Sequence, residues 1–235
     1  MIKGPLKGIR VIDLSRGIAG PWAAMIMGDL GAEVIKIEAT AEGDVARIID
    51  GPKHNGETFY FLAFNRNKKS VVMDLSTPSG KQALIDLIKV SDVLIENFRP
   101  GSMDRMGLGY KDLKKINKRI IMWQNSGYGY SGPYKNRACY EVASQGYTGM
   151  LDLTREAPGR PPIRSAPPIG DMGSGFFGVI GVLAALQHRE RTGRGQLIQT
   201  TMLGACMAMM CYHFSHYFIS KEIPQAVGSG HLGML

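Results

Sequence analysis

The chain has 235 residues and a hydrophobic share of 44%, which is typical of a globular protein with a sizeable core. It contains no run of about 18 uncharged apolar residues and begins without the apolar segment of a signal peptide, so we expect no membrane partner. Its three cysteines, Cys139, Cys206 and Cys211, lack metal-ligand spacing and favour a reducing, cytoplasmic location.

The net charge of +8 also bears on the partners of the chain. Its basic residues are scattered, and no alternation of aromatic and basic side chains indicates a surface for stacked bases, so we expect no nucleic-acid partner. The densest basic group, between Lys111 and Arg119, is typical of the solvated face of a short helix. A positive balance also suits a small polyanion such as a nucleotide-bearing cofactor.

Short β-branched runs alternate with helical segments along the first half of the chain. The predicted strands cover residues 8–14, 33–38, 70–75, 92–97 and 120–123. The predicted helices between them begin near Pro21 and at Pro78, and a third, short one holds Leu113 and Ile116. This alternation predicts an α/β fold with a doubly wound, mostly parallel sheet and helices on both faces. Such sheets bind ligands beyond the carboxyl ends of their strands.

Two longer stretches, residues 39–69 and 152–170, interrupt this alternation and are predicted to be irregular. After the second stretch, the pattern predicts a helix over 172–190, a strand over 196–201 and an apolar helix over 203–219.

Two motif-like patterns are weak signals. Gly127 to Gly132 has the G-x-G-x-x-G spacing, but no apolar helix follows it, so we interpret it as a turn-rich loop rather than a dinucleotide site. His213 and His216 lie three residues apart without a third ligand nearby in the sequence, which favours core or interface histidines. We therefore expect no metal.

Asp171 is the most informative residue of the sequence. It stands between small residues in the segment 169–175, directly before a long apolar run that is predicted to be a buried helix. Asp is a favoured residue for capping the N-terminus of a helix, so its spacing alone favours a capping role. The alternative is a reactive carboxylate, because the flanking glycines let another segment or a ligand come close.

Several segments together resemble the class III coenzyme A transferases, the family of formyl-CoA transferase, carnitine and bile-acid CoA transferases and methylacyl-CoA racemases. Two of the blocks, Glu96-Asn97-Phe98-Arg99-Pro100-Gly101 and Arg191-Thr192-Gly193-Arg194-Gly195-Gln196, are specific to that family. The resemblance runs in order from about residue 5 to residue 203, through residues 6–14, 19–21, 30–38, 65–70, 92–101, 127–129, 170–171 and 191–196.

The resemblance implies that Asp171 is a nucleophile. CoA would move from an acyl-CoA donor to a small carboxylic acid through an aspartyl-acyl anhydride and an aspartyl-CoA thioester. Backbone N–H groups near the start of the helix are expected to stabilise a developing oxyanion.

The resemblance also implies how coenzyme A would be held. Gly17, Ile18 and Ala19 would line its path, Asn97, Phe98, Arg99 and Arg105 would meet its nucleotide, and Tyr60 and Tyr140 would lie near the acyl group. The alternatives are surface ion pairs of Arg99 and Arg105 with Asp104 or Glu96, and aromatic packing for the two tyrosines.

The sequence departs from the family pattern at the acyl site. Ile18 and Ala39 replace a glutamine and a basic residue of the formyl-CoA enzyme, so a larger or more apolar acyl group is as well suited as oxalate or formate. Cys139-Tyr140-Glu141 replaces the Gly-His-Asp of the racemase branch. Because the histidine is missing, we rank transferase above acyl-CoA racemase.

The resemblance also predicts the domain organisation. Residues 1–225 would form a large Rossmann-like domain, and residues 226–235 a linker stub towards a missing small domain. The family implies an interlocked homodimer, and a partner subunit is the other possibility. A third interpretation is an inactive CoA-binding fragment or a subunit that needs a partner chain.

Overall fold

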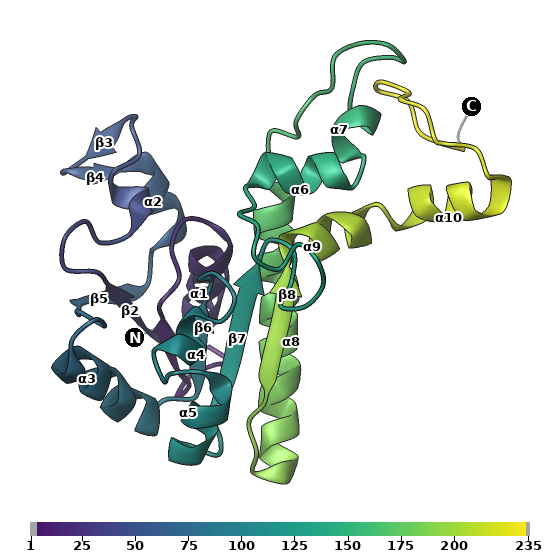
Figure 1. Ribbon diagram of the computed structural model, residues 1–235. Helices are drawn as coiled ribbons and strands as arrows, with labels where there is room; N and C mark the ends of the chain where they lie inside the picture. Colours follow the sequence, from purple (N-terminus) through teal and green to yellow (C-terminus); the bar gives the residue numbers. More distant parts are fainter. Residues whose placement is uncertain (1–3, 234–235) are drawn as a thin grey trace.

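A six-stranded parallel sheet forms the centre of the computed structural model (Figure 1). The structure describes residues 4–233. Residues 1–3 of the predicted large domain and residues 234–235 of the predicted linker lie outside the described residues. The strand order is β5-β2-β1-β6-β7-β8. The strands are β1 (Arg10–Asp13), β2 (Glu33–Glu38), β5 (Lys68–Val72), β6 (Val93–Glu96), β7 (Ile121–Ser126) and β8 (Leu197–Thr201). Every neighbouring pair is parallel, so the predicted fold class is confirmed.

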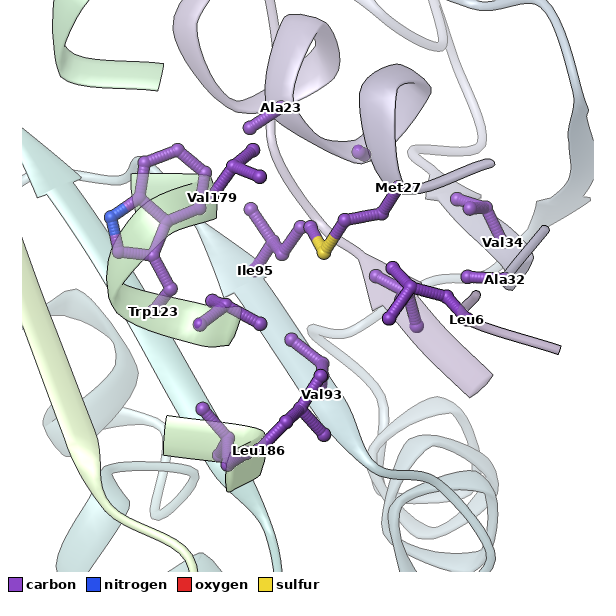
Figure 2. Close-up of a cluster of buried hydrophobic side chains, with 14 of the residues drawn as sticks. Leu6, Ala23, Met27, Ala32, Val34, Val93, Ile95, Trp123, Val179 and Leu186 are labelled. Carbon is purple, nitrogen blue, oxygen red and sulfur yellow. The ribbon is translucent and has the colours of Figure 1, made fainter. Parts of the chain in front are cut away.

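Helices cover both faces of this sheet, as predicted. One face packs against α1 (Ala19–Asp29) and α8 (Ile169–Thr192). The helices of the other face are α3 (Pro78–Lys89), α4 (Ser102–Arg105) and α5 (Tyr110–Ile116). Figure 2 shows the first of the two cores, where α1 supplies Ala23 and Met27, α8 supplies Val179 and Leu186, β6 supplies Val93 and Ile95, and β7 supplies Trp123.

Helices cover both faces of the central strands. All residues of β6 and β7 are buried. The helix after β5 begins as predicted, with the Thr77 hydroxyl accepting the Gly80 N–H at 3.0 Å and Pro78 in the first turn.

The long helix α8 packs very closely on β7. A Cβ on Gly178 would lie 2.2 Å from the Trp123 ring, and the Trp123 indole N–H donates to Thr200 Oγ1 at 2.9 Å. Among the described residues, α8 has the length and hydropathy of a membrane span, which the sequence analysis did not anticipate. Half of its most apolar stretch is buried against the rest of the fold, as in the core helix of a globular domain.

Several predicted boundaries are wrong. The strand expected to end at residue 123 continues to Ser126, and the helix expected from residue 172 begins at Ile169. Three further differences are larger. The strand expected at residues 70–75 is β5 (Lys68–Val72), because it is an exposed edge strand whose register is set by pairing Lys68 with Val34 of β2. The stretch 39–69 is more regular than expected: it holds the 3-10 turn η1 (Val45–Arg47), the hairpin β3 (Lys53–His54) and β4 (Glu57–Thr58), and helix α2 (Phe59–Phe64).

The third difference is the apolar helix expected at residues 203–219, which is divided at Met210 into α9 (Met202–Met209) and α10 (Cys211–Ser220). Two short helices, α6 (Glu141–Tyr147) and α7 (Met150–Leu153), were not predicted. Residues 127–132 form the expected turn-rich loop. In Figure 1, α10 extends away from the sheet, and none of its residues is buried.

The sheet order contains one reversal that positions the site. From β1 the chain moves outward through β2 to β5, and it then returns to the other side of β1 to form β6, β7 and β8. The carboxyl ends of β1 and β6 therefore face a crevice from which their following loops diverge. Open α/β sheets bind ligands at such a switch point.

Candidate active site

A side-chain clamp joins the two loops at the switch point. Asn97, which follows β6, accepts the Arg16 N–H at 2.9 Å with its side-chain oxygen and donates to the Arg16 carbonyl at 2.8 Å with its amide. Arg16 belongs to the loop between β1 and α1, in which Gly17 has a φ of +77°, a left-handed conformation that favours glycine. Asn97 thus fixes the backbone of the predicted CoA-binding loop.

A cavity of about 410 Å³ opens between these loops and the start of α8. It collects six of the predicted site residues, namely Asp171, Gly17, Ile18, Asn97, Tyr60 and Tyr140. Residues that the sequence analysis did not assign to the site complete the wall, among them Arg16, Val45, Ile49, Asn125, Cys139, Glu141 and Met202. Residues distant in the sequence therefore meet at one end of the sheet.

Asp171 lies in the first turn of α8, but it does not cap the helix. The Glu141 carboxylate, at the start of α6, accepts the Gly170 N–H at 3.0 Å and the Asp171 N–H at 2.8 Å. The capping role that spacing favoured for Asp171 therefore belongs to Glu141, whose partner amides are 29 and 30 residues away in the sequence. The Asp171 carboxylate is left to face the cavity.

The same contacts bear on the expected oxyanion site. Glu141 already accepts the Gly170 and Asp171 amides, so a developing oxyanion would need other N–H groups near the helix start while these contacts persist. The flanking glycine was interpreted correctly, since a Cβ on Gly170 would lie 2.4 Å from Ser144 Oγ of α6. Gly170 therefore allows the close approach of another segment.

The environment of Asp171 favours its protonated form. Burial and, after it, the negative charge of Glu141 raise its pKa to about 7, although a backbone hydrogen bond from Ala19 lowers it. A carboxyl group with a pKa near neutrality in a cavity is typical of a functional site.

The two tyrosines have different surroundings. Tyr60 packs edge-on against Phe59 and Phe64, with ring centroids 5.9 and 5.4 Å away, and also borders the cavity. Burial and, after it, the negative charge of Asp171 raise its pKa to about 12, so Tyr60 remains a neutral hydrogen-bond donor. Tyr140 is 79% exposed at the mouth of the cavity, so the packing alternative is wrong for this residue.

A second cavity, of about 610 Å³, lies on the other side of Arg16. Phe98 and Arg99 border it, together with the apolar side chains of Leu14, Ile37, Met73, Leu75 and Met106. Arg105 borders neither cavity and donates to Ser102 Oγ at 3.0 Å, and Ala19 is buried beneath the first loop. Within residues 4–233, Arg99 and Arg105 form no ion pair, so the surface-pair alternative is not observed.

A buried charge network supports the first loop, and the sequence analysis missed it. Lys36 of β2 lies 2.7 Å from Asp44 and 3.8 Å from Asp13, and Lys68 of β5 lies 2.9 Å from Asp13. Asp44 in turn accepts the Gly17 N–H at 3.0 Å. Burial alone would raise the pKa of Asp13, but Lys36 and Lys68 lower it to about 2. Charged residues inside otherwise apolar strands were the available sequence signal.

No group of three or more metal-ligating side chains occurs in the described part of the chain, including the region around His213 and His216. The Asp171 cavity brings together the carboxyl groups of Asp171 and Glu141, the Tyr60 hydroxyl and the Cys139 thiol, and Arg16 borders both this cavity and the second one.

A doubly wound domain with one carboxylate at the switch point is the class of structure that these observations define. The sequence matches the model of CoA-transferase family III over residues 6–235, so the chain belongs to this family. A crystal structure of a CaiB/BaiF family protein from Brucella suis superimposes with a TM-score of 0.92 at 37% identity, covering 97% of this chain and 61% of that one.

Curated relatives agree with this assignment. The chain is 38% identical over 227 residues to succinyl-CoA:glutarate CoA-transferase of Mus musculus, covering 97% of this chain and 52% of the relative. It is 42% identical over 198 residues to the beta subunit of succinyl-CoA–L-malate CoA-transferase of Chloroflexus aurantiacus, covering 84% and 49%. The chain thus spans about half of the length of these relatives.

Proposed function

We propose that this chain carries the nucleophile of a CoA transferase, which moves CoA from an acyl-CoA to a small carboxylic acid. The observation that carries the proposal is the position of Asp171, whose carboxylate faces a cavity at the switch point while Glu141 takes over its capping role. Family membership and the names of the relatives, which are CoA-transferases, support CoA transfer as the reaction class.

The proposed reaction begins with the ionised Asp171. One of its oxygens attacks the thioester carbonyl carbon, the carbon–sulfur bond breaks, and the products are an aspartyl-acyl anhydride and the CoA thiolate. The thiolate attacks the Asp171 carbonyl of the anhydride, which gives an aspartyl-CoA thioester and releases the acyl group as a carboxylate. The acceptor carboxylate attacks the carbonyl carbon of this thioester and expels the CoA thiolate, which gives a second aspartyl-acyl anhydride. The thiolate then attacks the acceptor's carbonyl carbon in that anhydride, which forms the new acyl-CoA and releases the Asp171 carboxylate.

The surroundings of Asp171 suit this sequence of steps. Partial burial makes the Asp171 carboxylate more nucleophilic, and the negative charge of the neighbouring Glu141 raises the free energy of the ionised form. Acylation of Asp171 removes that charge repulsion. Tyr60, held neutral, is placed to donate a hydrogen bond to oxygen atoms of the acyl group.

Coenzyme A would extend across both cavities. Its thiol end would lie beside Asp171, along Gly17 and Ile18, and its nucleotide would enter the second cavity beside Phe98 and Arg99. Ala19, which is buried and borders neither cavity, would not contact it. The apolar floor of that cavity and its basic rim suit a purine base joined to phosphates. Arg105, which borders neither cavity, would contact only the outer part of the nucleotide.

The names of the relatives pair succinyl-CoA with glutarate, succinyl-CoA with L-malate, and acetyl-CoA with oxalate. We propose short carboxylic acids of this kind as donor and acceptor. We also propose that the chain works as a homodimer or with a partner subunit, as the separate alpha and beta subunits among its relatives suggest. The free cysteines are consistent with the proposed cytoplasmic location.

Covalent trapping tests the nucleophile. The chain is incubated with succinyl-CoA, treated with hydroxylamine and digested, and the peptides are mapped by mass spectrometry. We expect a hydroxamate on Asp171 and none in Asp171→Asn, with Asp152→Asn as a control that keeps the label. A label on Glu141, or undiminished transfer by Asp171→Asn, would contradict the proposal.

A further inference from the structure

Unpaired positive charge surrounds the second cavity. Arg16, Lys81 and Arg99 border it, and none of them forms an ion pair within residues 4–233. The two carboxylates of the same cavity have other partners: Glu38 pairs with Arg47 at 2.7 Å, and Asp74 accepts from Ser76 at 2.6 Å. The cavity therefore presents net positive charge to a ligand.

Arg16 differs from the other two cations in its position. It borders the second cavity and also the cavity of Asp171, whereas Lys81 and Arg99 border the second cavity alone. Its backbone is held on both sides by Asn97. Its guanidinium carbon lies 5.9 Å from the centre of the Phe98 ring, and Phe98 borders the second cavity but not the first.

The guanidinium thus lies beside Phe98, and the Arg16 residue borders both cavities. A ligand that extends from Asp171 into the second cavity must pass this side chain. We propose that Arg16 binds the diphosphate of coenzyme A, a role that rests on the proposed function of the chain. In coenzyme A, the diphosphate joins the thiol-bearing pantetheine arm to the nucleoside, so it would lie where the two cavities meet.

The chemistry of the side chain fits this ligand. A guanidinium presents a planar set of N–H donors that matches two phosphate oxygens, and it is always charged. Arg16 is exposed and its backbone is already ordered, so binding a phosphate orders only the side chain. Two other anionic groups of an acyl-CoA compete as ligands, namely the 3′-phosphate of the ribose and the free carboxylate of a dicarboxylic acyl group.

Calorimetric titration separates these possibilities without requiring turnover. The wild-type chain, Arg16→Met, Arg16→Lys and the control Arg194→Met are titrated with CoA, 3′-dephospho-CoA, pantetheine and succinyl-CoA. Arg194 suits the control because it is an exposed arginine in the turn before β8, at the opposite end of the sheet.

We expect Arg16→Met to weaken CoA binding about tenfold, which is typical of losing a charge-assisted pair. The same factor should apply to dephospho-CoA and succinyl-CoA, and pantetheine affinity should not change. Arg16→Lys should lie between, because it keeps the charge but loses the planar donor pair. The control should remain within about twofold of wild type.

Other outcomes overturn the proposal. Unchanged CoA affinity in both Arg16 variants would remove Arg16 from the phosphate site, although CoA binding by the wild-type chain would leave the proposed function intact. An effect that disappears with dephospho-CoA would assign Arg16 to the 3′-phosphate, and one confined to succinyl-CoA would assign it to the acyl carboxylate. Failure of the wild-type chain to bind CoA would count against both proposals.

Discussion

Two carboxylates define the site at the scale of single residues. The Glu141 carboxylate accepts the N–H groups of Gly170 and Asp171 at the start of α8, and its negative charge acts on the Asp171 carboxylate. One group therefore orders the helix start and also disfavours ionisation of its neighbour. This arrangement raises the free energy of the ionised form of Asp171. The free energy of unfolding should therefore depend on pH.

The first prediction concerns Asp171→Asn. The folded-state pKa of Asp171, about 7, lies above the ordinary value of 3.8, so the folded chain binds this proton more tightly than the unfolded chain. Asp171 should thus lower the free energy of unfolding as pH rises from about 4 to about 7. The asparagine variant should be more stable at pH 8, by on the order of 1 kcal/mol or more, in urea titrations. Equal stabilities at pH 8 would contradict the raised pKa.

The pH dependence of transfer is the second prediction. If ionised Asp171 is the nucleophile, kcat/KM should rise about tenfold per pH unit below pH 7 and then level off. Glu141→Gln removes a negative charge next to Asp171, so the acidic limb should shift to lower pH. Glu156→Gln, which removes a charge from an exposed surface pair, should leave the profile where it is.

The sequence predicted much of the site at this scale, and its failures have one cause. Asp171, Asn97 and Tyr60, which the family resemblance singled out, line one cavity. Glu141 and the pairing of Lys36 with Asp44 were missed, because both depend on how loops fold back onto other elements, which no local spacing shows. Spacing along one helix cannot show that a residue thirty positions away supplies its cap.

Helix α8 carries the tightest packing at the scale of secondary-structure elements, and it supports the third prediction. Gly178→Ala would place a methyl group 2.2 Å from the buried Trp123 ring. We expect a loss of about 1–3 kcal/mol in the free energy of unfolding, because the indole is held by Thr200 and cannot shift freely. Gly146→Ala on α6, where a Cβ meets Leu151 at an ordinary 3.5 Å, should be neutral or slightly stabilising.

The buried charge network at the ends of β1 and β2 supports the fourth prediction. Lys36→Met would leave Asp13 and Asp44 without their shared partner in the interior. We expect a loss of about 3–5 kcal/mol, measured by urea unfolding, as for other broken buried pairs. Lys69→Met removes an exposed pair with Glu33 and should change stability by less than about 1 kcal/mol. A small effect of Lys36→Met would show that water reaches the network.

Element prediction succeeded where the apolar pattern was strong. Strands β1, β2 and β6 lie within the predicted ranges because short β-branched runs mark them. Strand β7 continues past its predicted end at residue 123 because its last three residues, Gln124 to Ser126, are polar. The edge strand β5 begins two residues earlier than predicted because its first residues, Lys68 and Lys69, are polar. Helices α2 and α6 were missed because they have six and seven residues, fewer than two turns, which is too short for an apolar period.

Among the large apolar side chains that residues 4–233 expose, two groups lie on helices α8 and α10. Phe176 and Ile180 lie on the outer side of α8, and Phe218 and Ile219 lie on α10, where Ile219 is 85% exposed. Exposed apolar surface of this kind is typical of a face that contacts another protein surface. It is consistent with the proposed assembly into a homodimer or with a partner subunit.

The fifth prediction follows from this surface. The chain, with a mass of 25.7 kDa, should associate as its concentration rises, as measured by light scattering after size exclusion. Replacing Phe218 and Ile219 by glutamate should weaken association, because two charges would have to be desolvated in the contact. A strictly monomeric wild-type chain at high micromolar concentration would contradict the prediction.

The clamp of Asn97 on Arg16 determines how a substitution of Asn97 would affect the two cavities. It ties the two diverging halves of the sheet together at the place where both cavities meet, so neither half can relax alone. A change at Asn97 would disturb the reacting end and the recognition end in the same event. We therefore expect that substitutions which change the substrate range of the proposed transferase leave Asn97 unchanged and occur at other wall residues, such as Val45 and Ile49.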